Sequence, residues 1–203
     1  MIKFLAIMVA VLASSSALAN ESESAHKGAD HSKMGNMHKG MMQGEHQGHG
    51  NQVDAHFLDR FMKHHQDGIE MAKFAQQKAH APEIKKMASK ISKDQPKEIA
   101  QMQKWRKEHF SSVAKANDMP PSMDMSKLRS ATGAEFDIVF ADMMAKHHDD
   151  GIKMVESVEG QLKNPEVKRF AEQSRKNQMM ERDQLAQLKS SFQSSMSGTT
   201  SAE

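Results

Sequence analysis

An internal repeat constrains the fold of this chain more than any other feature. When the 203-residue sequence is shifted against itself by 83 positions, the two copies align without a gap. The stretch "FMKHHQDGIEM" at 61–71 then lies over "MAKHHDDGIKM" at 144–154, and Pro82 lies over Pro165. Because self-similarity at a fixed offset indicates one structural unit that is used twice, both copies are expected to have the same local structure.

Each copy contains two segments with helical periodicity. In the first segment, steps of 4, 3, 4, 3 and 4 place on one helix face the residues Phe57, Phe61, His64, Gly68, Met71 and Ala75. Helices are predicted at about 53–79, 82–110, 133–161 and 165–192. Asn164 before Pro165 is a typical helix start, and Thr132 with Glu135 forms a capping box. The sequence therefore predicts an all-α four-helix bundle made of two tandem helical hairpins.

Changes in composition divide the chain further. Residues 1–19 combine Lys3, an apolar run and an Ala-Leu-Ala ending, which predicts a cleaved secretory signal peptide and a periplasmic protein. Residues 20–52 offer almost no aliphatic or aromatic side chain for burial, which predicts a disordered arm. No later segment is apolar enough to span a membrane. The remaining predicted boundaries are the bundle at 53–192, its first hairpin at 53–112, a crossover at 113–132, the second hairpin at 133–192 and a disordered tail at 193–203.

The usage of sulfur and imidazole side chains points to a metal. The chain has no cysteine, which excludes disulfides and thiolate sites, but it has 19 methionines and 12 histidines. A thioether remains an available ligand in an oxidising compartment, and it prefers soft ions such as Cu(I). The formal net charge is only +2 and basic residues are mixed with acidic ones, so no nucleic-acid partner is expected.

The predicted arm is rich in both candidate ligand types. They are His26, His31, Met34, Met37, His38, Met41, Met42, His46 and His49. Histidine-rich tracts of this kind often bind metal. A solubilising tail is the alternative, but it explains the predicted disorder and not the enrichment in histidine and methionine.

Polar residues interrupt the apolar helix faces at matching positions of the two copies. His64 and His147 are expected to point into the core, with His65 and His148 at its edge. The partner helices carry, within otherwise apolar stripes, Gln95, Glu98, Gln178 and Glu181. Since a buried carboxylate needs a partner, the histidine and the glutamate of each hairpin are expected to meet.

Two interpretations of these polar positions remain open. The first is a structural histidine–glutamate pair that fixes the register of the helices. The second is a metal site in which the glutamate orients the imidazole. The duplication of paired histidines, each followed by a methionine on the same face, favours the metal. The candidate ligands are then His64, His65, Met71, His147, His148 and Met154, with Met62 and Met102 as further candidates and Gln95, Glu98, Gln178 and Glu181 as supporting residues.

Motifs typical of catalysis are missing from the sequence. No predicted helix carries the Glu-x-x-His motif of di-iron bundles, and the chain lacks His-Glu-x-x-His, a nucleophile motif and a glycine-rich phosphate loop. No catalytic residues and no enzyme activity are therefore predicted. Histidine and methionine suit Cu(I) through the thioether and either oxidation state of copper through imidazole, and silver(I) is expected to mimic Cu(I).

The repeated "HHxxGIxM" segment, followed by Ile91, Gln95, Glu98 and Ile99 in the pattern "IxxxQxxEI", resembles the exported ferritin-like four-helix bundles that include the CopM copper-resistance proteins. The resemblance covers 53–192 in both copies. It implies a periplasmic bundle that binds Cu(I) and Cu(II) and lowers the free copper available to the cell. The ligands that it implies are His64, His65, Met71, His147, His148 and Met154. Ser174 and Arg182 replace the two isoleucines in the second copy, which predicts a weaker or wetter second site.

The predicted function is to buffer, sequester or carry copper in the periplasm. Metal ions are the expected ligands, and another periplasmic copper carrier or exporter is the expected partner. Two alternatives stay open at this point. One is a periplasmic chaperone or stress protein whose methionine-rich helices form an adaptable client surface. The other is a metal-dependent oxidoreductase.

Overall fold

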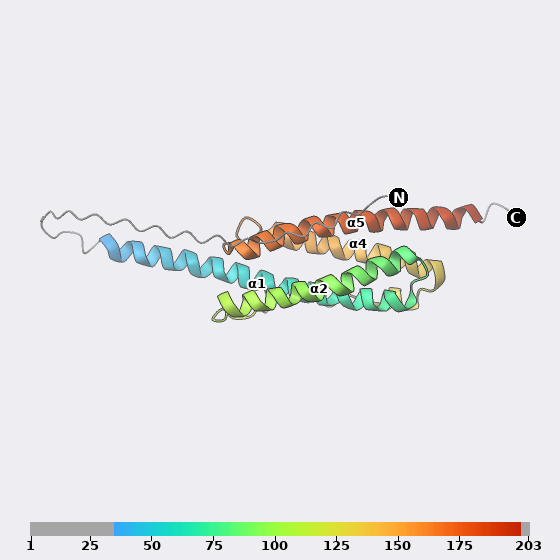
Figure 1. Ribbon diagram of the computed structural model, residues 1–203. Coiled ribbons are helices and arrows are strands. Elements are labelled where there is room, and N and C mark those ends of the chain that lie inside the picture. Colours follow the sequence, from blue (N-terminus) through green and yellow to red (C-terminus); the bar gives the residue numbers. More distant parts are fainter. Residues whose placement is uncertain (1–34, 200–203) are drawn as a thin grey trace, which may run out of the picture.

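The computed structural model describes the backbone of residues 35–199 and the side chains of residues 50–197. Four long helices and one short helix form this part of the chain. They are α1 (Gly35–Lys78), α2 (Pro82–His109), α3 (Ser126–Ser130), α4 (Gly133–Val158) and α5 (Pro165–Thr199). α1 and α2 form one hairpin, and α4 and α5 form the other (Figure 1). The prediction of an all-α bundle of two tandem hairpins is confirmed.

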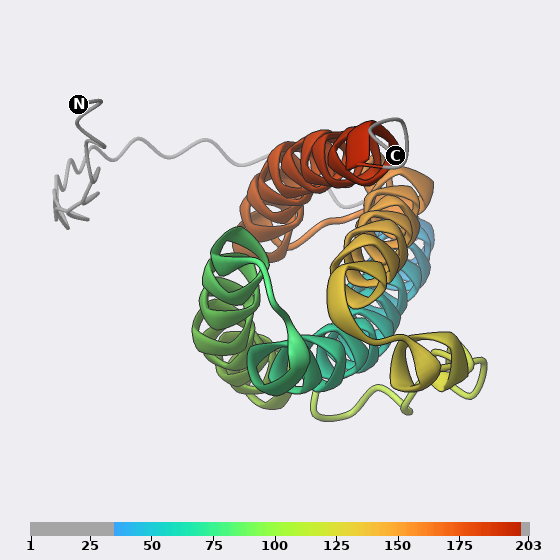
Figure 2. The same ribbon diagram turned by 90° about the vertical axis from the view of Figure 1, so that its right-hand side faces the viewer.

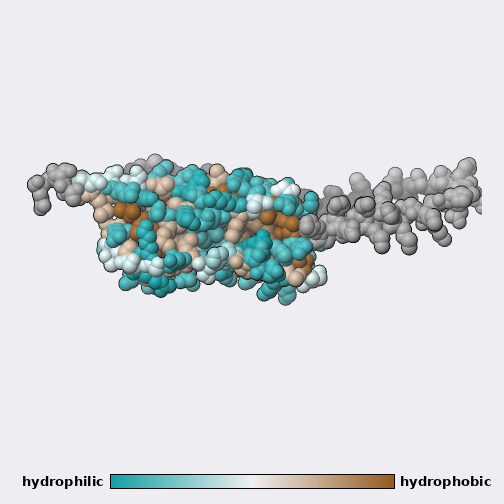
Figure 3. Space-filling model, turned by 180° about the vertical axis from the view of Figure 1, so that it is seen from behind, coloured by the Kyte–Doolittle hydropathy of each residue, from teal (hydrophilic) through white to brown (hydrophobic). Residues whose placement is uncertain are grey.

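The four long helices surround a common interior. Viewed along the bundle, α1, α2, α5 and α4 follow one another around a ring (Figure 2). α1 packs against both α2 and α4, whereas α2 and α5 face each other across a more open side. The outer face seen from behind is largely hydrophilic, with small separate hydrophobic patches (Figure 3). Apolar side chains therefore lie mainly inside the ring, as the helical stripes predict.

The core consists of two apolar clusters. The first contains Met71, Phe140 and Met144, and the second contains Phe61 and Trp105. Each cluster contains residues from both hairpins. This follows because α1 and α4 run antiparallel, so the second half of α1 packs against the first half of α4. The paired histidines fall between the two clusters along both helices, so a polar layer divides the core at its middle.

Two buried aspartates, 83 residues apart, tie the hairpins together. Asp137 of α4 accepts hydrogen bonds from the backbone N–H groups of His80 (3.0 Å) and Ala81 (2.8 Å), in the turn of the other hairpin. Asp54 of α1 accepts the N–H of Lys163 at 3.0 Å in the same way. Sequence analysis missed both residues, although their matching positions in the repeat were a signal that could have revealed them.

The outer ends of the bundle differ from the predicted boundaries. α1 begins at Gly35, inside the predicted arm at 20–52, and α5 continues to Thr199, past the predicted helix end at 192. Helical hydrogen bonds are local, and neither extension contains a proline, so both helices can continue beyond the packed core. The predicted signal peptide at 1–19 lies outside the described residues. Among residues 35–199, no helix has the length and apolar character needed to cross a bilayer.

Two local features of the second hairpin also bear on the predictions. The Asn164 cap is confirmed, since its Oδ1 accepts the N–H of Glu166 at 2.8 Å. The capping box was wrong: Thr132 precedes α4, but its side chain makes no capping hydrogen bond. Gly133 has a left-handed φ of +60° at the helix start, which does not suit the geometry of the box. α3, anchored by the buried Leu128, was not predicted because five residues are too few to show a periodicity.

Candidate metal site

The four paired histidines form a layer across the middle of the bundle. The rings of His64 and His147 stack with their centroids 3.8 Å apart and an interplanar angle of 7°. The Nε2–H of His64 donates to the carbonyl oxygen of His147 at 2.8 Å. Both point into the core as predicted. The prediction that His65 and His148 lie at the edge of the core was wrong, because both are 0 % exposed beneath the partner helices.

His65 and His148 are the rings that meet the glutamates. His65 Nε2 lies 2.6 Å from Glu98 Oε2, and His148 Nε2 lies 2.8 Å from Glu181 Oε2. The expected pairing within each hairpin is confirmed, but it involves the second histidine of each pair. Neighbouring residues of a helix point about 100° apart, so the first ring faces the other hairpin while the second faces the partner helix.

Glycines bring α1 and α4 close enough for the ring stack. A Cβ on Gly68 would lie 2.9 Å from His147 Nε2, and a Cβ on Gly151 would lie 2.7 Å from His64 Cε1. Each glycine thus makes room for the histidine of the opposite hairpin. A side chain at either position would also press on the supporting glutamine, Gln95 or Gln178.

Replacing Gly151 by alanine tests this packing. A glycine-to-alanine change inside a helix normally stabilises it by about 1 kcal/mol. Here we expect a net loss of about 1–2 kcal/mol, because the new methyl group would displace the His64 ring and overpack the core. The measurement is urea unfolding followed by circular dichroism. Gly160→Ala is the control, since no atom lies within 4 Å of its Cβ position; equal effects of the two changes would contradict the close packing.

Hydrogen-bond partners determine which ring nitrogen stays free. Carbonyl and carboxylate oxygens can only accept, so Nε2 carries the proton in His64, His65 and His148. In a neutral ring the other nitrogen, Nδ1, then has a lone pair, and in all three rings Nδ1 is buried without a hydrogen-bond partner. Nε2 of His147 is likewise buried and unpartnered. Such buried groups are rare, and these four nitrogens are candidate ligands.

Burial keeps the stacked pair neutral. It lowers the pKa of His64 to about 4, against the opposing effect of the hydrogen bond to the His147 carbonyl. Burial, followed by charge on His64, also lowers the pKa of His147 well below its usual value. Because a metal binds the deprotonated nitrogen, both rings are in the form that can bind metal at neutral pH.

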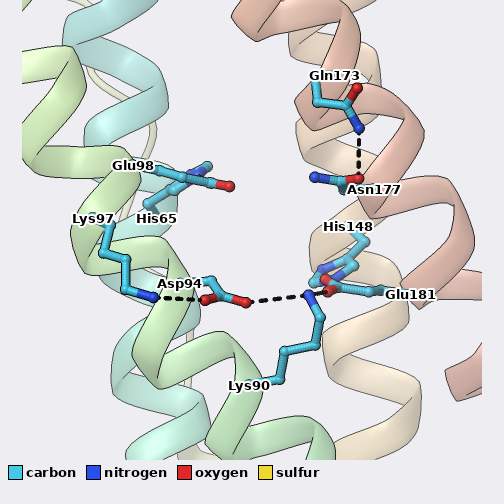
Figure 4. A network of polar contacts seen from close by, with 9 residues as sticks. All are labelled: His65, Lys90, Asp94, Lys97, Glu98, His148, Gln173, Asn177 and Glu181. Carbon is cyan, nitrogen blue, oxygen red and sulfur yellow. Dashed lines mark hydrogen bonds and ion pairs between the residues drawn. The ribbon is translucent and has the colours of Figure 1, made fainter. Parts of the chain in front are cut away.

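A polar cavity of about 310 Å³ lies between α2 and α5. Its walls include the glutamates Glu98 and Glu181, whose side chains are 30 % and 13 % exposed. Lys90 of α2 crosses the cavity and donates to Glu181 Oε1 at 2.6 Å (Figure 4). Burial would raise the pKa of Glu181, but hydrogen bonds from His148 and Lys90 lower it below its usual value. Sequence analysis missed Lys90, because the side chain of a lysine on a helix surface normally extends into solvent.

The predicted methionine ligands lie one or more helical turns from the paired rings. Met71 is fully buried, one turn beyond Gly68, and Met154 is half-buried one turn beyond Gly151. Seven residues of helix span about 10 Å, so neither methionine is level with the first histidine of its own copy. Among the side chains that the structure describes, no group of three or more histidine, aspartate or glutamate residues is arranged to hold one metal ion. The predicted ligands therefore share a region of the core but do not form a closed cage.

Met62 and Met102 flank the His65–Glu98 pair. Met62 precedes His65 by three residues and Met102 follows Glu98 by four, so each shares a helix face with one member of the pair. Both pack in the same apolar cluster. The corresponding positions of the second copy hold Ala145 and Leu185. The first pair therefore has two methionines one turn away, whereas the second pair has one, the buried Met144 four residues before His148.

Residues 39–188 match a sequence family described as a domain of unknown function, DUF4142. The chain belongs to the DUF4142 family. Similar solved structures include CopM in the Cu(II)-bound form, which is 30 % identical and has a TM-score of 0.61, over 68 % of this chain and 97 % of that chain. CopM in the Cu(I)-bound form is 31 % identical, with a TM-score of 0.61 over 68 % of this chain and 96 % of that chain.

Solved structures with lower sequence identity to this DUF4142 protein also share its fold. A DUF305 protein from Streptomyces coelicolor shows the same fold at 23 % identity, with a TM-score of 0.63 over 70 % of this chain and 94 % of that chain. No curated protein matches the chain. The resemblance to CopM is confirmed. The CopM and DUF305 structures compared with this chain are not described as enzymes.

The arm ligands of this DUF4142 protein remain predictions. His26, His31 and Met34 lie outside the described residues. The others lie on the first turns of α1, where the structure describes the backbone and not the side chains, and they are Met37, His38, Met41, Met42, His46 and His49.

Proposed function

We propose that this DUF4142 protein is a periplasmic copper-binding protein that binds Cu(I), Cu(II) and silver(I) through the histidine layer of its core. In this role it buffers, sequesters or carries copper and supports copper resistance. The observation that carries the proposal is the set of four buried imidazoles, each with one ring nitrogen that has no hydrogen-bond partner. In three of them a protein acceptor holds the opposite nitrogen, as is usual for histidines that bind a metal.

The donor set favours copper and silver over harder ions. Neutral imidazole suits copper in both oxidation states, and thioethers select Cu(I) and silver(I). Met62, Met71 and Met102 supply thioethers within one or two helical turns of the rings. The similarity to CopM, which has been solved with Cu(I), Cu(II) and silver, supports the same metals here.

Two N-terminal segments support the proposed location and partners. The signal-like segment at 1–19 supports export to the periplasm. The histidine- and methionine-rich arm is proposed to capture ions, either for the core or for another periplasmic copper carrier or exporter. Residues 39–188, the matched family region, include both the core and the last part of this arm.

A Cu(I) competition titration of the mature chain, residues 20–203, tests the proposal. A ligand that binds only the folded state, at a hundredfold excess over its Kd, adds roughly 2.7 kcal/mol to the stability. We therefore expect Cu(I) to raise the melting temperature of the wild type. In the double variant His65→Gln with His148→Gln the rise should disappear, although the arm still binds copper.

A matched double variant provides the control. His80 and His109 are exposed histidines outside the layer, so changing both to glutamine should preserve the copper-induced rise. An equal rise in the His65/His148 variant, or no rise in the wild type, would overturn the proposal. In either case the histidine–glutamate pairs would be structural and any copper would be bound by the arm.

A further inference from the structure

The two histidine–glutamate pairs are equivalent in the repeat, but they differ in their third partner. Glu181 receives the ammonium of Lys90 from the opposite hairpin at 2.6 Å. The residue 83 positions after Lys90 is Gln173, which would be the corresponding partner of Glu98. Instead, Gln173 Nε2 donates to Asn177 on its own helix at 2.9 Å (Figure 4). The His148–Glu181 pair therefore has a lysine ammonium as its third partner. The equivalent position for the His65–Glu98 pair holds a neutral glutamine that bonds within its own helix.

We infer that the two histidine–glutamate pairs are inequivalent metal sites: the His65–Glu98 pair takes a metal ion first, and Lys90 is a resident cation that disfavours a metal ion at the His148–Glu181 pair. This inference rests on the proposed function and adds an order of filling to it. An ion that binds at His148 must either tolerate the nearby Lys90 ammonium or displace it from Glu181.

Charge differs between the two pairs in the required direction. Within the described part of the chain, no lysine or arginine bridges to Glu98, whose only ion-pair partner is His65. Glu181 is already neutralised by Lys90, which is also held by Asp94 at 3.4 Å. Since opposite charges attract most strongly in a partly buried site, an arriving ion gains more beside the pair whose carboxylate has no other cation.

Two amide oxygens that lie against Gly68 and Gly151, next to the histidine layer, also suit a cation. The side-chain oxygens Oε1 of Gln95 and Gln178 are buried without a hydrogen-bond donor. The two glutamines are only 6 % and 4 % exposed, and both line the cavity. A buried carbonyl-type oxygen without a donor is costly, and a bound ion or its water would satisfy it. This observation does not depend on the glutamates.

The neighbouring soft side chains favour the same order. The first pair has Met62 and Met102 one helical turn away, whereas the second pair has Ala145 and Leu185 at these positions. Met144, buried four residues before His148, is the one thioether a turn from the second pair, so a soft ion finds two thioethers beside the first pair and one beside the second. The first site gives tight binding at low metal, and the second site gives capacity that opens when metal is abundant enough to displace Lys90.

Silver(I) titration of the ¹⁵N-labelled mature chain tests the order, with the ring ¹⁵N shifts of His65 and His148 as the readout for each site. In the wild type, half of the His65 shift should occur at a silver concentration about tenfold lower than for His148. Lys90→Gln should bring the two midpoints together. Gln173→Lys should raise the His65 midpoint by about tenfold, because it installs the second lysine.

Lys93→Gln is the matched control, since it removes the same charge from an exposed position of α2 and should leave the order unchanged. Coincident midpoints in the wild type, or a Lys90→Gln variant that keeps the tenfold separation, would overturn the inference and leave the proposed function intact. Shifts of the arm histidines without any shift of His65 or His148 would instead overturn the proposed core site, and the inference with it.

Discussion

Replacing Asp137 by alanine is expected to lower the free energy of unfolding by about 3 kcal/mol. The carboxylate is only 3 % exposed and accepts the N–H groups of both His80 and Ala81 in the turn before α2. Ala81, at the N-cap of α2, has no side chain that could satisfy this helix start. Each unsatisfied donor costs about 1–3 kcal/mol, and bonds to a charged acceptor are the stronger ones.

The measurement is chemical unfolding of the variant beside Asp142→Ala. Asp142 lies on the same helix, but its side chain is 48 % exposed and pairs with Lys189 at the surface. Exposed pairs contribute roughly 0–1 kcal/mol, so this change should be mild. Asp54→Ala should resemble Asp137→Ala, because Asp54 ties the opposite turn. If Asp137→Ala cost no more than the surface control, the tie between the hairpins would not be a stabilising contact.

Periodicity and the repeat were sufficient to predict the bundle and the layer of polar residues. The stripe that contains His64 is buried as predicted, because a helix face is fixed by the spacing of its residues. The contact of each glutamate with a histidine was also predictable, since a carboxylate in an apolar stripe needs a partner. These inferences require only the hydrophobic pattern and the cost of burying charge.

The particular side-chain contacts between helices could not be predicted from the periodicity of each helix. Which of two adjacent histidines meets the glutamate depends on how α2 lies against α1, and here it is His65 and not His64. Lys90 and Glu181 are 91 residues apart in the sequence, and only the packing of α2 opposite α5 brings their side chains into contact. Asp54 and Asp137 looked like surface residues, because nothing in a single helix shows that another hairpin's turn covers them.

The free energy of unfolding is expected to fall as the pH is lowered from about 7 to 4, through the stacked histidines. The pKa of His64 is about 4 in the folded protein, against an ordinary value of 6.5. Between these values the unfolded chain binds a proton that the folded chain does not, so stability rises with pH in this window. His64 alone accounts for a loss of about 3 kcal/mol at the acid end. His147 shifts in the same direction and adds to it.

Charged groups near the rings affect the expected pH dependence. His65 and His148 lower the pKa of His64 when charged, and Asp150 raises it. The pKa of Glu181 is also lowered, and the stability that it contributes is lost only as the pH falls below the ordinary glutamate value of 4.5, beneath most of the histidine window. Unfolding measured at pH 7, 6 and 5 therefore reports mainly on histidine. The variant His64→Gln with His147→Gln should flatten this dependence.

If that variant does not fold, ¹⁵N shifts of the wild-type rings give the same information directly. A His64 ring that titrates near its ordinary value of 6.5 would contradict the expectation. A ring that stays neutral down to about pH 4 would also bear on metal binding, because protons and metal ions compete for the same nitrogen. Its lone pair would remain available in mildly acidic conditions, where a histidine with the reference pKa of about 6.5 becomes charged and binds metal less well.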